Sequence, residues 1–168
     1  MSMRNDRFVG VGNMILGIDP GLHSGWAVLD DHDHLLEHGE LRFDLKRQPC
    51  PSSIVKTLSE RYNLHMACIE SQYLGENPRS CISLAQNAGR WVEACAAAGI
   101  PVVALVEPST WQHAELSIRG RTRREQRKAA SISKCRGLWH IDLVDHCADA
   151  ALIARWAAVE SQPGGSLS

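Results

Sequence analysis

The chain has 168 residues, which suits one domain of ordinary size and leaves little room for a second. Its 44% hydrophobic and 22% charged residues are typical of a globular protein, and no apolar run approaches the roughly 18 residues of a membrane span. The N-terminal segment lacks the apolar stretch of a signal peptide. We therefore expect a cytoplasmic protein without membrane contact, with a flexible N-terminus (1–13), one domain (14–160) and a disordered tail (161–168).

Positive charge is concentrated in one segment, although the net charge of the chain is only −1. Residues 119–128 hold one acid, Glu125, and six basic side chains, which are Arg119, Arg121, Arg123, Arg124, Arg127 and Lys128. A basic stripe of this kind is typical of proteins that bind a phosphate backbone. A solvated helix face is the other interpretation of the same pattern.

Apolar runs and turn residues predict the secondary structure in chain order. Strands are expected over residues 14–19, 25–29 and 35–43, with turns at Pro20-Gly21 and 30–34. There follow a helix that opens at 49–52 and ends near 62, a strand over 65–70, a helix over 79–98, a strand over 101–106, a short helix from Pro108, and helices over 122–136 and 145–160. This order predicts an α/β domain in which three hairpin-linked strands are extended by strands with crossover helices.

Two further groups of side chains raise the question of metal binding. The six cysteines are scattered without a Cys-x-x-Cys pair, which favours buried, reduced thiols over a zinc site or a disulfide framework. His32, His34 and His38 stand among acidic residues. We interpret that stretch as a polar hairpin turn rather than a second metal site, because histidines in a loop lack rigid positioning.

Three apolar segments each deliver a carboxylate. Asp19 ends the first buried strand, Glu70 ends a later one, and Asp149 lies within the apolar last helix. A carboxylate in such surroundings is costly unless it is paired or metal-bound, although a strand-terminal Asp can also be a simple turn residue. His146 lies three residues before Asp149 on the same helical face, and Asp145 is interpreted as the N-cap of that helix. An oxygen-rich set of this kind suits Mg²⁺ or Mn²⁺.

These residues lie in motifs that resemble those of RuvC-type Holliday junction resolvases. Four segments match in the family's order, between about Met14 and Ala158. They are Gly17-Ile18-Asp19-Pro20-Gly21, Ile69-Glu70-Ser71-Gln72-Tyr73 with Asn77, Gly120-Arg121-Thr122-Arg123-Arg124, and His146-Cys147-Ala148-Asp149-Ala150-Ala151. The resemblance implies an RNase H-like fold, with a mixed five-stranded sheet flanked by helices.

The resemblance also implies roles for single residues. By position, Asp19, Glu70 and Asp149 become metal-binding carboxylates, with Asp19 as the ligand shared by two ions. His146 takes a fourth position that is often Asp in the family, and is expected to be a metal ligand or a proton-transfer group. The implied DNA contacts are Tyr73, which matches an aromatic that stacks on an unpaired base, together with Asn77, Arg119, Arg121, Arg123, Arg124 (commonly Lys in the family), Arg127 and Lys128. Packing is the alternative role for Tyr73.

The implied function is a structure-selective endodeoxyribonuclease that resolves Holliday junctions by two-metal hydrolysis with Mg²⁺, for which Mn²⁺ can substitute. One ion would activate water and the other would stabilise the leaving 3′-oxygen. A four-way junction has two equivalent strands to cut, so a homodimer is expected, and branch-migration proteins are candidate partners. The helix over 79–98 is a candidate interface through Trp91, which core packing explains equally well.

Three other functions compete with this one. A broader branched-DNA or flap endonuclease would use the same residues. A junction-binding protein without cleavage is suggested by His146 in place of a carboxylate. An actin-like ATPase also begins with a strand carrying Gly-Ile-Asp, but it needs two such domains, and the length of this chain disfavours it.

Overall fold

A computed structural model describes residues 12–43, 50–71, 78–120, 122–165 and 167. Its strands are β1 (Met14–Asp19), β2 (His23–Leu29), β3 (Leu35–Arg42), β4 (Leu64–Glu70) and β5 (Val102–Val106). Its helices are α1 (Pro51–Arg61), α2 (Pro78–Ala97), α3 (Pro108–Leu116), α4 (Arg124–Trp139) and α5 (Asp145–Glu160). These elements follow the expected order, with boundaries shifted by a few residues. In the described part of the chain, no helix is both long and apolar enough to cross a membrane.

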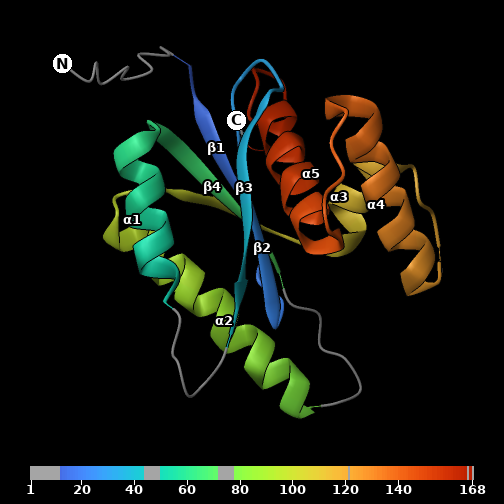
Figure 1. The fold of residues 1–168 in the computed structure, drawn as a ribbon, viewed down its shortest axis with the longest axis horizontal. Coiled ribbons are helices and arrows are strands. Elements are labelled where there is room, and N and C mark those ends of the chain that lie inside the picture. Colours follow the sequence, from blue (N-terminus) through green and yellow to red (C-terminus); the bar gives the residue numbers. More distant parts are fainter. Residues whose placement is uncertain (1–11, 44–49, 72–77, 121, 166, 168) are drawn as a thin grey trace, which may run out of the picture.

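The strands form one mixed sheet in the order β3-β2-β1-β4-β5 (Figure 1). The first three strands pair antiparallel through β1–β2 and β2–β3, whereas β1–β4 and β4–β5 pair parallel. Parallel pairs require crossover connections, and α1 and α2 supply them. The predicted α/β class, with a mixed five-stranded sheet flanked by helices, is therefore confirmed.

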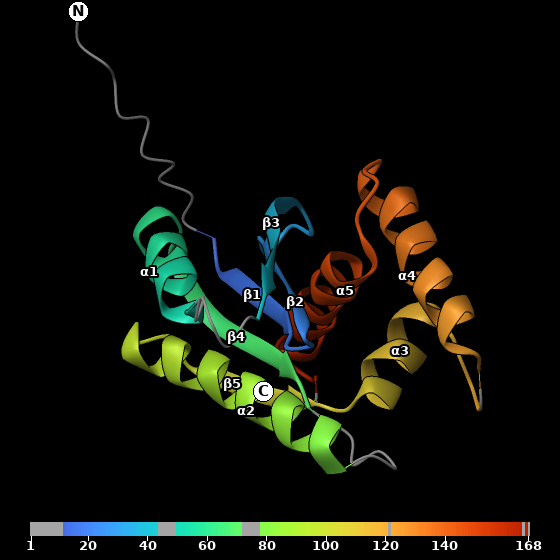
Figure 2. The ribbon, with the colours of Figure 1, turned by 60° about the horizontal axis from the view of Figure 1, so that its bottom comes forward.

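Helices cover both faces of the sheet (Figure 2). On one face Ile15, Ala27 and Cys68 pack against α5, and on the other Leu16 and Val28 pack under α1 and α2. Burial on both faces explains why the central strands are continuous apolar runs rather than alternating ones. Trp91 of α2 belongs to the second core and is only 1% exposed. Core packing therefore accounts for Trp91, whereas helix α2 stays a candidate interface through its exposed side chains.

The turn between β2 and β3 is held by its own polar groups. Asp30 accepts hydrogen bonds from the backbone N–H groups of His32 and His34, at 2.9 and 2.8 Å. Asp33 has a φ of 66°, a left-handed conformation that Asp tolerates in turns. The interpretation as a polar turn is confirmed for His32 and His34, whereas His38 lies within strand β3.

The C-terminal residues that were expected to be disordered make local contacts where they are described. The backbone N–H of Leu167 donates to the carbonyl of Glu160 at 3.0 Å, and its side chain packs against the α5 core.

The cysteines follow their prediction for the most part. Cys68, Cys95, Cys135 and Cys147 are buried free thiols, and burial raises the pKa of each to about 12. Cys50 is exposed.

One ion-pair network ties the β2–β3 turn to the helices. Arg155 of α5 lies 2.8 Å from Asp33 and 2.6 Å from Glu115 of α3, whose side chain is only 4% exposed. Trp139 at the end of α4 also donates to the Asp33 carbonyl, at 2.7 Å. A carboxylate as buried as Glu115 depends on its cationic partner.

We expect the substitution Arg155→Leu to lower the free energy of unfolding by about 3 kcal/mol, because it leaves Glu115 buried without its cation. Urea unfolding followed by circular dichroism measures the change. Arg136→Leu is the matched control, since it breaks the exposed pair Arg136–Asp142 and should cost less than about 1 kcal/mol. Equal effects of the two substitutions would contradict the importance of this network.

Candidate active site

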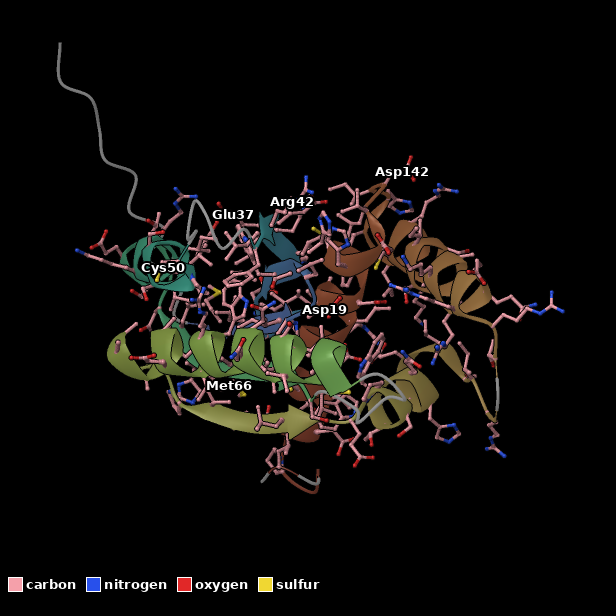
Figure 3. The ribbon with its side chains drawn as sticks, turned by 90° about the horizontal axis from the view of Figure 1, so that it is seen from below. Asp19, Glu37, Arg42, Cys50, Met66 and Asp142 are labelled. Atoms are coloured by element: carbon pink, nitrogen blue, oxygen red, sulfur yellow. The ribbon has the colours of Figure 1, made fainter. Side chains whose placement is uncertain are left out.

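Two carboxylates meet at the carboxyl ends of neighbouring parallel strands. Ile18 of β1 is paired with Ile69 of β4, so the next residues, Asp19 and Glu70, lie side by side. Side chains alternate along a strand, and Cys68 points into the core on the α5 side. Glu70, two residues later, therefore points to that side as well. Figure 3 labels Asp19 near the middle of the molecule.

Helix α5 brings the third carboxylate, and two glycines allow its approach. A Cβ atom on Gly17 would lie 2.1 Å from the Ala150 carbonyl oxygen, and one on Gly25 would lie 2.0 Å from that of His146. Only hydrogen can occupy that space, so β1 and β2 contact the backbone of α5 directly. Asp149 lies within this contact region of α5, and it is thereby brought next to Asp19 and Glu70.

Burial and mutual repulsion dominate the electrostatics of this carboxylate trio, Asp19, Glu70 and Asp149. Burial and the neighbouring charges of Glu70 and Asp149 hold the pKa of Asp19 well above its ordinary value. Burial, with repulsion from Asp149, raises the pKa of Glu70 to about 7. Burial raises the pKa of Asp149 to about 6, against the lowering effects of Ser131, Lys128 and His146. A site with such perturbed carboxylates favours either protons or a cation.

Neutral side chains support the trio, and the sequence did not reveal them. The indole N–H of Trp111 in α3 donates to Glu70 at 3.2 Å. Two hydrogen bonds to the Gly21 carbonyl hold the turn after Asp19: Asn87 of α2 donates at 3.3 Å, and the Ser24 hydroxyl of β2 donates at 2.9 Å. In the sequence, Trp111 is recognisable only as an apolar residue in the short helix that begins at Pro108. Nothing in the residue spacing indicates that it contacts Glu70.

His146 lies beside the trio and contacts other carboxylates. Its Nε2 is 3.1 Å from Glu40 of β3, and its Nδ1 is 3.1 Å from Asp145. The ring of His23 lies 5.8 Å away, centroid to centroid. The interpretation of Asp145 as an N-cap is wrong. Val144 caps α5 without a side-chain hydrogen bond, and Asp145 is the first helical residue, paired with Lys128 of α4.

The basic segment lies next to the acids. Arg123 and Arg124 are exposed at the start of α4, and Arg119 is exposed before it. Arg127 and Lys128 are half-buried, and their charges lower the pKa values of Glu70 and Asp149, respectively. The predicted DNA contacts Tyr73, Asn77 and Arg121 lie outside the described residues.

The chemistry of the trio fits a divalent cation. Its oxygen donors are buried, and their repulsion disfavours full ionisation unless positive charge enters the site. Among the described residues, no three His, Cys, Asp or Glu side chains are already close enough to form a coordination shell. Asp19, Glu70 and Asp149 are the residues that would hold such an ion.

The sheet order, with α5 packed across its centre, defines the RNase H-like fold. Within this fold, the chain is similar to crossover junction endodeoxyribonuclease RuvC. A RuvC from Magnetococcus marinus is 29% identical over 98 residues, which cover 52% of this chain and 54% of that protein. A RuvC from Hyphomonas neptunium is 32% identical over 99 residues, which cover 52% of this chain and 58% of that protein. The chain thus matches little more than half the length of either relative.

Solved structures establish the shared fold over a larger part of the chain. Thermus thermophilus RuvC in complex with a Holliday junction substrate has a TM-score of 0.64 at 21% identity, covering 84% of this chain and 90% of that one. A second structure of the same protein has a TM-score of 0.63 at 21% identity. No family model matches the chain. The resemblance to RuvC that the four motifs indicated is confirmed.

The raised pKa values predict how stability depends on pH in the presence of a chelator. Between about pH 4 and pH 7 the folded chain binds more protons than the unfolded chain, because the pKa of Glu70 rises to about 7 and that of Asp149 to about 6. The free energy of unfolding therefore falls as pH rises through this window. Glu70→Gln should remove part of the fall, and should be more stable than wild type at pH 8 by on the order of 1–3 kcal/mol.

Urea unfolding in EDTA from pH 4 to pH 8 tests this expectation. Glu93→Gln, an exposed carboxylate on α2, is the matched control and should leave the pH dependence unchanged. Parallel stability curves for wild type and Glu70→Gln would contradict the assigned electrostatics.

Proposed function

We propose that this protein is a structure-selective endodeoxyribonuclease that resolves Holliday junctions, with roles in DNA recombination and repair. The observation that carries the proposal is the buried trio of Asp19, Glu70 and Asp149, brought together by two parallel strands and α5. The similarity to RuvC in sequence and fold supports the choice of substrate. Mg²⁺ is the proposed cofactor, and Mn²⁺ is expected to substitute for it.

Different residues are proposed to bind the metal and to bind DNA. Asp19, Glu70 and Asp149 would bind the metal, with Asp19 central because both other carboxylates raise its pKa. When bound, divalent cations supply an activated water and stabilise the leaving oxygen. Trp111 orients Glu70, and His146 is proposed as a fourth ligand or as a proton-transfer group at the edge of the trio.

The α4 helix is proposed to grip the phosphates that flank the cleaved bond. Arg123 and Arg124 are exposed for such contacts, while Arg127 and Lys128 reach toward the acids. Arg119, Arg121, Asn77 and Tyr73 remain proposed contacts, with Tyr73 stacking on an unpaired base. Positive charge on this side would offset the repulsion between the trio and the DNA backbone.

A homodimer and a cytoplasmic location complete the proposal. A two-fold dimer matches the two equivalent strands of a junction. Large apolar side chains exposed on neighbouring elements, Ile82 of α2 and Leu105 of β5, offer a candidate surface for the second copy. Branch-migration proteins remain candidate partners.

The direct test is cleavage of a labelled synthetic four-way junction beside matched linear duplex and flap DNA, in Mg²⁺ or Mn²⁺. We expect paired symmetric nicks on the junction, and a loss of at least about a hundredfold in the Asp19→Asn variant, which keeps the shape of the side chain but removes its charge. Asp142→Asn, an exposed residue paired with Arg136, is the matched control and should cut normally.

The other outcomes each assign a different function. Metal-dependent cutting of all branched forms would indicate a broader branched-DNA endonuclease. Tight junction binding without cleavage in either metal would indicate a binding protein, and would point to His146 as the reason. Unpaired, independent nicks would argue against the homodimer.

Phosphate contacts by α4 predict a weaker dependence of binding on salt in charge-removing variants. The logarithm of the association constant falls linearly with the logarithm of salt concentration. Arg124→Gln should make this negative slope shallower by about one, because one phosphate contact is lost. Fluorescence anisotropy of a junction, in calcium to prevent cleavage, measures the slope. Lys56→Gln on α1, whose ammonium lies near Glu60, should leave it unchanged. A change confined to one DNA sequence would contradict a backbone contact.

A further inference from the structure

The ring of His146 lies between two carboxylates that the four motifs do not include. Asp145, the preceding residue on α5, approaches Nδ1 to 3.1 Å. Glu40 of β3 approaches Nε2 to the same distance. The ring itself is largely covered, with 17% of the side chain exposed, and its Nε2 is a buried atom without a hydrogen bond of good geometry to any described residue.

The fold brings these three side chains together from separate elements. Glu40 is paired across the strands with Gly25, and the space above Gly25 is filled by the carbonyl of His146. Asp145 is the first residue of α5, where it also contacts the ammonium of Lys128 from α4. His23 of β2 is the other ring close to His146. The contacts of His146 therefore come from β2, β3 and its own helix, α5, and Lys128 of α4 contacts Asp145.

A neutral imidazole carries one proton, so two carboxylates at its two nitrogens compete for it. A carboxylate at Nδ1 favours the proton there and leaves the lone pair on Nε2, the buried nitrogen. A carboxylate at Nε2 favours the opposite tautomer. Histidines that bind metals commonly have the other ring N–H fixed by a carboxylate in this way.

We propose that Asp145 and Glu40 are positioning residues that set the tautomer of His146, with Asp145 keeping Nε2 open for a cation and Glu40 competing for that nitrogen. The consequence for the metal rests on the proposed function, whereas the tautomer belongs to the metal-free protein. Both carboxylates act through His146, and neither is assigned contact with DNA or metal.

The first measurement is the tautomer of His146 in metal-free protein labelled with ¹⁵N-histidine, from two-bond ¹H–¹⁵N correlations under alkaline conditions where the nitrogen shifts report a neutral ring. Asp145→Asn should shift the population toward Nε2–H, and Glu40→Gln should shift it toward Nδ1–H, each by roughly threefold to tenfold. Glu37→Gln is the matched control on β3, because its carboxylate contacts Arg61 and Tyr62 instead. A shift in the same direction for both variants, or none in either, overturns the proposal.

The second measurement is Mn²⁺ affinity by electron paramagnetic resonance, with Asp145→Asn made both in wild type and in His146→Ala. Loss of the partner that orients a ligand should weaken binding by about 10–100-fold while His146 is present, and by much less once it is absent. Equal losses in the two backgrounds would mean that Asp145 acts by charge alone, and would overturn the proposal. If the tautomer shifts as expected but the wild-type protein cuts no junction, the proposed function fails and the assignment of Asp145 and Glu40 to His146 stands.

Discussion

The direct contact between α5 and the glycines of β1 and β2 is the constraint on which the site depends. At Gly17 and Gly25 the helix backbone occupies space that any side chain would fill. This proximity is what allows Asp149, carried by a helix, to join two carboxylates carried by strands. Since both faces of the sheet are buried, α5 cannot tilt away without exposing the apolar residues beneath it. The geometry of the site is thus fixed by core packing rather than by its own polar contacts.

The same contact makes the site electrostatically costly. Three carboxylates are pressed together with their pKa values raised by burial and mutual repulsion, and only part of this is offset by Arg127, Lys128 and the indole of Trp111. A cation bound at the proposed site would recover part of this free energy. The α4 helix adds positive charge on the side from which a phosphate would approach. The proposed metal site, on β1, β4 and α5, and the proposed phosphate contacts, on α4, would therefore lie on neighbouring elements.

Much of this arrangement could be predicted from the sequence. Apolar runs ending in Asp19 and Glu70 located the strand ends, and the register of β1 with β4 then brought those residues together. Contacts between side chains that lie far apart in the sequence could not be predicted from it. Glu40 carries no signal in the sequence, and only the pairing of β3 with β2 places it opposite Gly25 and within reach of His146. Asp145 fitted the pattern of a cap, but its carboxylate contacts Lys128 and His146 instead.

These contacts bear on the proposed role of His146, at a position where the resemblance implies that a carboxylate is common. An acid there would bring a further negative charge into a trio that already resists ionisation, whereas imidazole can donate a lone pair without adding charge. Imidazole can bind a cation only through the ring nitrogen that carries no proton, so its tautomer matters. An ionised carboxylate has no such requirement, because both of its oxygens have lone pairs. The carboxylates of Asp145 and Glu40 lie at the two nitrogens where that requirement arises. A histidine in this position therefore depends on its neighbours more than an aspartate would, and its function has to be judged together with theirs.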